Sequence, residues 1–448
     1  MAKKQPPSSG LRVRARAHLW QPFTQMQEWN EEEFPVIASA RGTTLFDADG
    51  RPYIDGNSSL WCNVHGHRHP AIDRAVASQL RRAAHTTLLG LAHPAAIDLA
   101  ELLSEVAPRG LTRVFLSDSG SEAVEVALKM AFQYWRQVRP SENRTKFVTF
   151  SGAYHGDTLG AVSAGAIPVF HNLFKPLLFP TIQAPCPYSP TDPVKAAGRA
   201  LAELARILKT HARELCAVIV EPVVQAAAGI LPQPDGFVKT VRDLCTASGV
   251  LLIADEVAVG FGRTGTLFAC DRDGTTPDLM ALGKGLTGGY LPLSATLATE
   301  TIYSAFLAPW HEMRHFFHGH TFAGNPLACA AALASLDVFA AEKTMKKLPA
   351  KIARFERRLE RFRDHPHVGD VRSRGLMGAV ELVLTRPSSA YDPALRMGHR
   401  VTVECRKRGL VLRPLGDAVV LVPALSMEAR TMDRMFDILE ESMEAATR

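Results

Sequence analysis

Between residues 93 and 285, short apolar runs alternate with longer stretches in which apolar residues recur every three or four positions. The apolar runs lie within residues 112–118, 217–224, 250–257 and 277–282, and they are typical of strands buried on both faces. The longer stretches have the periodicity of amphipathic helices, and they lie at residues 93–107, 119–135 and 236–249. This alternation predicts an α/β fold with a mainly parallel sheet between helices.

The rest of the chain predicts a second, smaller domain. We expect a large domain at residues 71–336 and an α+β domain at residues 337–448. Residues 1–70 form an N-terminal segment that we expect to contribute to the small domain and to a substrate pocket. Within it, residues 43–56 predict two short strands joined by a turn. The first ten or so residues are polar and rich in Pro and Ser, which predicts a loose tail.

Composition narrows the class of protein. The 448 residues include 51 basic and 45 acidic side chains, 46% hydrophobic residues and seven cysteines. The densest basic stretch, residues 351–365, interleaves Arg and Glu at helical spacing, which favours a solvated helix face over a nucleic-acid surface. The N-terminus lacks the apolar core of a signal peptide, and no apolar run reaches the ~20 residues that span a bilayer. We therefore expect a cytoplasmic protein with reduced thiols that binds neither nucleic acid nor a membrane.

Two glycine-rich motifs suggest nucleotide binding but fit it poorly. Residues 260–265 read GFGRTG, yet Asp255 and Glu256 precede the glycines and would repel a pyrophosphate. The GKGLT segment around Lys284 resembles the end of a P-loop, but Gly285 stands where that motif has Ser or Thr. A nicotinamide-dependent oxidoreductase therefore remains only a rival hypothesis.

Two histidine-rich segments, residues 65–69 and 315–320, could bind a metal. Neither has the spacing of a known zinc motif, and no CxxC pair occurs in the chain. Polar loop histidines are the favoured interpretation of both segments.

Ligands of parallel sheets bind beyond the carboxyl ends of the strands. The residues that follow the predicted strands are therefore the candidates for chemistry. They are Ser119, Gly120, Ser121, Tyr154, His155, Gly156, Glu221, Asp255, Glu256 and Lys284.

Several of these positions supply what a pyridoxal-phosphate (PLP) enzyme requires. A lysine must form a Schiff base with the cofactor, and Lys284 ends a strand between two glycines that leave room for a bulky adduct. A carboxylate must keep the ring nitrogen protonated, and Asp255 ends a buried strand. Gly120 and Ser121 begin a long helix, whose N-terminus favours a phosphate. Tyr154 follows another strand and can cover the ring.

Over almost its whole length the chain resembles the class III aminotransferases of fold type I. The cofactor signature of that family is LLIADEVAVGFGRTG at residues 251–265, followed by PDLMALGKGLTGG at residues 277–289. Narrower motifs include HLWQPFTQM, YHGDTLGAVS, HGHTFAGNPLACAAALASL and LRPLGD. They resemble the branch that converts 8-amino-7-oxononanoate to 7,8-diaminononanoate in biotin synthesis. The resemblance implies PLP as the cofactor and this transamination as the activity.

The resemblance also implies a role for each matching residue. Lys284 carries PLP, Asp255 pairs with its ring nitrogen, and Tyr154 stacks on it and faces the substrate. The further cofactor-binding residues are Gly120, Ser121, Glu221, His320 and Thr321, and Thr321 reaches the phosphate of the neighbouring subunit in a homodimer. The further substrate-binding residues are Phe23, Leu60, Trp61, Arg263, Gly319 and Arg413, and Arg413 meets the substrate carboxylate.

Three positions leave the amino donor open. Family members that use S-adenosylmethionine have Tyr, Trp and Pro where this chain has Phe23, Leu60 and His320. The changes resemble the branch that uses L-lysine, because a lost phenol and a lost indole remove a hydrogen bond and a stacking surface for an adenosyl sulfonium. Neutral variation at these positions is the alternative, so both donors remain candidates.

Two further functions remain as alternatives. Arg413 and the HLWQPFTQM segment argue against another class III aminotransferase that acts on an ω-amino acid or a diamine. A binding protein that only retains the fold would not need both Lys284 and Asp255.

Overall fold

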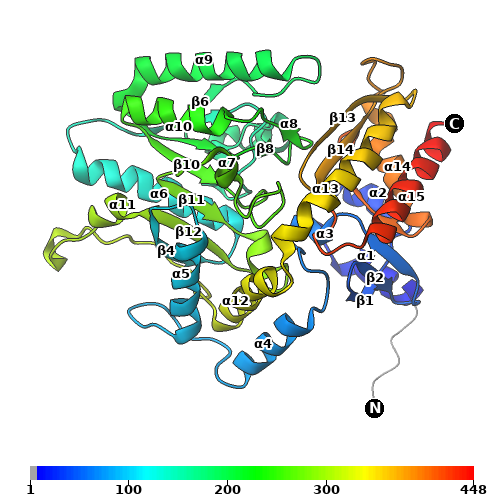
Figure 1. Cartoon of the computed structure of the whole chain (residues 1–448), viewed down its shortest axis with the longest axis horizontal. Helices are drawn as coiled ribbons and strands as arrows, with labels where there is room; N and C mark the ends of the chain where they lie inside the picture. Colours follow the sequence, from blue (N-terminus) through cyan, green and yellow to red (C-terminus); the bar gives the residue numbers. More distant parts are fainter. Residues whose placement is uncertain (1–7) are drawn as a thin grey trace.

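The computed structural model describes residues 8–448, and a seven-stranded sheet forms the centre of its larger part (Figure 1). The strand order is β4-β12-β11-β10-β7-β5-β6. The neighbouring pairs from β11 to β6 are parallel, whereas β12 runs antiparallel to both β11 and β4. The predicted α/β class is confirmed, and the antiparallel β12 is an addition that the sequence pattern did not show. The strands are β4 (Leu111–Ser117), β5 (Lys146–Phe150), β6 (Thr181–Ala184), β7 (Leu215–Val220), β10 (Leu251–Asp255), β11 (Leu279–Leu282) and β12 (Ser294–Thr299).

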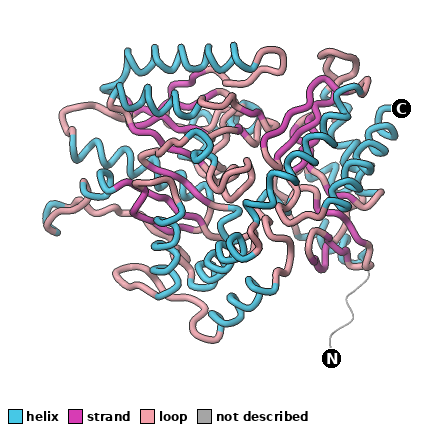
Figure 2. The backbone as a smooth tube through the Cα atoms, viewed as in Figure 1, coloured by secondary structure: helices cyan, strands magenta, loops and turns pink. Residues whose placement is uncertain are grey.

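Helices cover both faces of this sheet (Figure 2). On one face α6 (Gly120–Val138) packs its small side chains, such as Ala127, against the sheet. On the other face α9 (Pro193–His211) and α10 (Phe237–Ser248) contribute larger ones, such as Leu204. Every residue of β7 is buried, which explains its uninterrupted apolar sequence. Fully burying a side chain such as Leu204 contributes about 1.5–3 kcal/mol.

The smaller part contains two four-stranded sheets and the C-terminal helices (Figure 1). The first sheet, of order β1-β2-β3-β15, joins N-terminal strands to a strand from near the C-terminus. The second has the order β13-β14-β17-β16, and its residues 368–382 form a hairpin. The strands are β1 (Ile37–Arg41), β2 (Thr44–Asp47), β3 (Pro52–Asp55), β13 (Val368–Arg374), β14 (Met377–Leu382), β15 (Leu410–Val411), β16 (Arg413–Leu415) and β17 (Ala418–Leu421).

The remaining elements connect or cover these sheets. No helix within residues 8–448 is long and apolar enough to cross a membrane. Part of the expected loose tail, residues 1–7, lies outside the described residues, and the next three residues are helical instead of loose because they open α1. The other helices and strands are α1 (Ser8–His18), α2 (Met26–Glu31), α3 (Ser58–Trp61), α4 (Pro70–Leu80), α5 (Pro94–Val106), α7 (Leu159–Ala164), α8 (Pro168–His171), β8 (Val224–Gln225), β9 (Leu231–Pro232), α11 (Glu300–Ser304), α12 (Pro326–Ala341), α13 (Thr344–Glu360), α14 (Met397–Lys407) and α15 (Ala429–Thr447).

Candidate active site

A cavity of about 180 Å³ lies beyond the carboxyl ends of the central strands, at the start of α6. Parallel strands bring their carboxyl ends to one edge of the sheet, which is why residues far apart in sequence meet there. The predicted residues that line this cavity are Trp61, Gly120, Ser121, Tyr154, Glu221, Asp255 and Lys284.

Lys284 follows β11 and lies in an uncommon backbone conformation. Its φ of 40° is unfavourable for a residue with a side chain, at a cost of about 1–3 kcal/mol. Burial lowers the pKa of its amine from 10.5, and the Asp255 carboxylate opposes this shift. A Cβ at Gly285 would lie 2.9 Å from Phe261 Cβ, so this glycine accommodates the packing of Phe261. The expected room for an adduct is therefore not the reason for glycine at this position.

Asp255 forms a buried pair with a histidine. One of its carboxylate oxygens lies 2.7 Å from His155 Nδ1, and the other accepts the Val257 N–H at 3.0 Å. Both side chains are buried, and His155 Nε2 has no hydrogen-bond partner within residues 8–448. The sequence drew attention to His155 only as a neighbour of Tyr154. The structure assigns it a contact that fixes the orientation of the Asp255 carboxylate.

Glu221 holds the backbone of Tyr154. Its two carboxylate oxygens accept the N–H groups of Tyr154 at 3.0 Å and of Ala226 at 2.9 Å. Burial raises the pKa of Glu221 to about 7. Burial and the hydrogen bond from its hydroxyl to Asp157 also raise the pKa of Tyr154, so its phenol keeps its proton at neutral pH.

The start of α6 is shaped by close backbone approaches. A Cβ at Gly120 would lie 2.4 Å from a methyl group of Val257, and a Cβ at Gly156 would lie 2.1 Å from Ser121 Oγ. Glycine is therefore needed at both positions. The 19-residue α6 presents its N-terminal end to the cavity, and such an end attracts a phosphate.

These features fit PLP. The cavity combines a helix N-terminus for a phosphate, a buried carboxylate for a ring nitrogen and a lysine amine. His155, which carries the unpartnered imidazole nitrogen, lines the same cavity. A binding site for a polar aromatic cofactor requires this combination of groups.

Arg413 and Phe23 lie beside Tyr154, although the three come from opposite ends and the middle of the chain. The guanidinium carbon of Arg413 lies 5.6 Å from the centre of the Phe23 ring. Phe23 packs edge-on against Phe170, and Phe170 in turn packs against Tyr154. Burial lowers the pKa of Arg413, and within residues 8–448 it forms no ion pair. Its charge is therefore available to a carboxylate.

The other predicted residues do not line the cavity of this single chain. Arg263 is 1% exposed and donates hydrogen bonds to the carbonyls of Pro423 and Asn63. Burial lowers the pKa of Arg263 to about 10. The remaining predicted residues, Leu60, Gly319, His320 and Thr321, are exposed.

The histidines of residues 65–69 share no site. His65 lies 3.0 Å from the hydroxyl of Ser335, and His67 lies 2.9 Å from Asp55. His69 lies 2.9 Å from Glu342. Each imidazole therefore has its own partner. The second histidine segment differs and is described below.

The sequence profile of the family described as aminotransferase class-III matches residues 26–443. The chain belongs to the class III aminotransferases. It is a PLP-dependent transaminase, and its fold is the type I fold of that family.

Known relatives of this family member are similar over nearly its whole length. An adenosylmethionine-8-amino-7-oxononanoate aminotransferase of Nitratidesulfovibrio vulgaris is 52% identical, covering 98% of this chain and 82% of the relative. The enzyme of that name from Geobacter sulfurreducens is 50% identical over 98% of both chains. The crystal structure of the enzyme of that name from Methanocaldococcus jannaschii has a TM-score of 0.94 at 40% identity, covering 98% and 99% of the two chains. An (S)-enantioselective omega-transaminase from Thermomicrobium roseum has a TM-score of 0.92 at 32% identity over 98% of both chains.

Proposed function

We propose that this aminotransferase converts 8-amino-7-oxononanoate to 7,8-diaminononanoate in biotin synthesis. The names of relatives at up to 52% identity support this acceptor. The observation that carries the proposal is Arg413, a half-buried arginine near Tyr154 that forms no ion pair within residues 8–448, because the acceptor has a carboxylate at the far end of an aliphatic chain. An amine transaminase acting on substrates without a carboxylate has no need of this charge.

PLP, when bound, supplies the carbonyl that carries the amino group and the ring that accepts electrons. Lys284 acts as nucleophile and as the group that moves a proton at its Nζ, because its lowered pKa leaves more neutral amine than an exposed lysine has. Asp255, oriented by His155, holds a negative charge against the ring nitrogen. Tyr154, fixed by Glu221, covers the cavity on the side of Arg413.

The donor that we propose is S-adenosylmethionine, which the names of the relatives state. L-lysine is the second candidate, and the residues that favour it are Phe23 and Leu60. Phe23 lies near Arg413, and Leu60 directly precedes Trp61. A single-turnover absorbance scan without acceptor separates the two donors. Bleaching of the cofactor band by S-adenosylmethionine alone supports the first donor, and bleaching by L-lysine alone replaces it with the second. Phe23→Tyr is then expected to raise the rate with S-adenosylmethionine relative to the rate with lysine.

Turnover of the acceptor tests the reaction itself. Formation of the diamine from 8-amino-7-oxononanoate, followed by mass spectrometry, is the expected result. Activity with β-alanine or putrescine, together with none on the oxononanoate, would assign the chain to the ω-amino acid or diamine branch instead.

We also infer a cytoplasmic homodimer in which Thr321 reaches the phosphate of the partner's cofactor. The exposed apolar side chains before and after residue 318 support an interface there, since Phe317 is 67% exposed and Phe322 is 59% exposed. An apolar groove of about 640 Å³ between β4 and residues 302–316 adjoins them. Sedimentation equilibrium of the purified protein should give twice the chain mass of 48.8 kDa, and a monomeric active enzyme would contradict the inference.

A further inference from the structure

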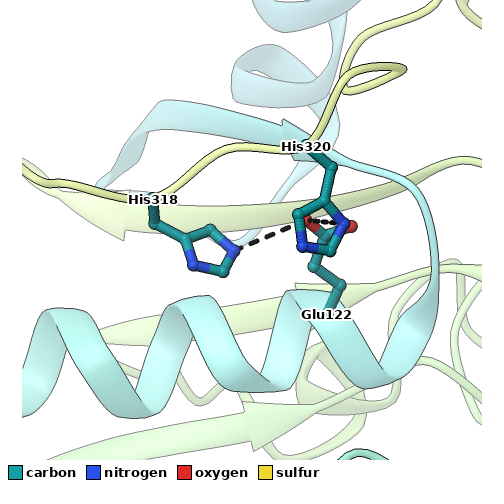
Figure 3. A group of neighbouring side chains, drawn as sticks. All are labelled: Glu122, His318 and His320. Atoms are coloured by element: carbon teal, nitrogen blue, oxygen red, sulfur yellow. Dashed lines mark ion pairs between the residues drawn. The ribbon is translucent and has the colours of Figure 1, made fainter.

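Three side chains with metal-binding atoms converge where the segment before α12 passes the first turn of α6 (Figure 3). Glu122 comes from α6, and His318 and His320 come from the segment. One ligand atom of each lies within 4.8 Å of those of the other two. Glu122 Oε1 lies 2.8 Å from His320 Nδ1 and 3.4 Å from His318 Nε2. His318 and His320 therefore share Glu122 as a neighbour, which the interpretation as polar loop histidines did not specify.

The two innermost atoms of this cluster lack hydrogen bonds. The Glu122 side chain is 4% exposed, and its Oε2 accepts the Asp118 N–H at 2.7 Å. Glu122 Oε1 and His318 Nε2 are both buried, and neither has a partner with hydrogen-bond geometry within residues 8–448. Buried polar atoms are rarely left unpaired in native proteins, so each requires a partner. We propose that Glu122, His318 and His320 bind a divalent transition-metal cation, of which Zn²⁺ is the representative probe.

The donor set and its spacing suit such a cation. Two imidazole nitrogens and one carboxylate oxygen form a known zinc ligand set, with room for water as the fourth ligand. Bonds of about 2.1 Å at tetrahedral angles place ligand atoms about 3.4 Å apart. The Glu122–His318 separation already has this value, and the Glu122–His320 separation must widen by about half an ångström. The His320 side chain, 54% exposed in the single chain, is the one that would move.

Two further charged groups face the site and act in opposite directions. Asp118 lies 3.3 Å from His320 Nδ1 and adds negative charge. Lys129 Nζ lies 3.0 Å from His318 Nδ1 and opposes a cation. When His318 binds metal through Nε2, its Nδ1 carries the proton and can no longer accept a hydrogen bond from Lys129. The Lys129 side chain must then turn away from His318. The Phe317 carbonyl, 3.4 Å from Lys129 Nζ, offers Lys129 an alternative acceptor.

Bound metal would connect α6 to the segment that carries Gly319 and Thr321. The proposal does not depend on the aminotransferase reaction, because all of its evidence lies outside the cavity lined by Lys284. Its test therefore measures binding of Zn²⁺ itself.

Full-length holoenzyme without a histidine tag is dialysed against a chelator and titrated with Zn²⁺ by calorimetry. We expect one tight site per chain and a higher Tm with Zn²⁺ present. His318→Ala and His320→Ala should each weaken that site at least tenfold. His315→Ala is the matched control, because His315 is exposed on the same segment but outside the cluster. Lys129→Gln should tighten binding several-fold by removing the opposing charge.

The visible spectrum of bound Co²⁺ provides a second measurement, because it reports the number and geometry of the ligands. Failure of wild-type protein to bind Zn²⁺ would overturn the proposal. Binding that is equal in wild type, His318→Ala and His320→Ala would also overturn it by placing the ion elsewhere. If His318→Ala does not fold, His320→Gln decides the question, and an unchanged Zn²⁺ affinity in that variant would overturn the proposal.

Discussion

Glu221 gives the folded protein a specific pH dependence that can be measured against a Glu221→Gln variant. Burial raises its folded-state pKa from 4.5 to about 7. Below pH 4.5 the carboxyl is neutral in both the folded and unfolded chains, so its ionisation does not change the free energy of unfolding. As pH rises from 4.5 through 7, the unfolded chain loses the proton first, so the free energy of unfolding falls. At high pH the accumulated loss is roughly 3 kcal/mol.

The diagnostic quantity is the difference in unfolding free energy between wild type and Glu221→Gln, compared at pH 5.5 and pH 8. The two pKa values place about 2 kcal/mol of the loss in this interval, which corresponds to roughly 2–4 °C in Tm for a chain of this size. The variant also loses one acceptor for the N–H of Tyr154 or Ala226, but that cost does not vary with pH. Only the change of the difference with pH therefore reports the proton.

Thermal unfolding of holoenzyme in buffers of matched ionic strength provides the assay. Wild type should lose Tm relative to Glu221→Gln as pH rises from 5.5 to 8. The control is Glu203→Gln, a partly exposed site on α9 where Arg206 lowers the carboxyl pKa, so that variant should not reproduce the trend. A difference that stays constant with pH would show that Glu221 does not take up a proton in this range. If wild type instead gained Tm relative to Glu221→Gln as pH rises, the hydrogen bonds from the two N–H groups would lower the pKa of Glu221 by more than burial raises it.

Three further predictions concern the cavity. Lys284→Ala should abolish turnover and still bind some cofactor, as measured by product formation and absorbance, and turnover near wild type would refute the assigned role. Gly120→Ala should destabilise the protein by about 1–3 kcal/mol and weaken PLP binding, because the new methyl group would meet Val257. Adding Val257→Ala to it should restore part of both losses. Arg413→Gln should raise KM for the oxononanoate at least tenfold with a smaller effect on kcat, and an unchanged KM would remove Arg413 from the acceptor site.

The sequence predicted the large domain and most of the cavity lining because both follow from one regularity. Asp255 ends β10 and pairs in register with Ala281 of β11, three residues before Lys284. Buried parallel strands are recognisable from continuous apolar runs, and their carboxyl ends must share an edge. The residue that follows each apolar run can therefore be named as a candidate site residue from the sequence alone.

The contacts that the sequence did not predict depend on side-chain packing between elements. His155 follows β5 and Asp255 ends β10, with β7 between the two strands, so their 2.7 Å contact has no local signature. The sequence pattern did not indicate β12, because its Ser, Ala and Thr residues show no clear periodicity of apolar and polar positions. Its burial comes from β11 and β4, which lie on either side of it. Glu122 lies almost 200 residues from His318, and nothing in either segment indicates the other.

The first turn of α6 shows why one short segment carries two kinds of chemistry. Its N-terminal end is electropositive, which favours a phosphate at Gly120 and Ser121, and Glu122 lies in the same turn. Glu122 accepts the N–H of Asp118, which lies just before the helix, with one oxygen, and this leaves its other oxygen for the two histidines. Because a phosphate and the Glu122 carboxylate would repel each other across one helical turn, a cation held by the histidines would relieve that repulsion. The positions of these groups are therefore electrostatically consistent, with each negative group on α6 next to a source of positive charge.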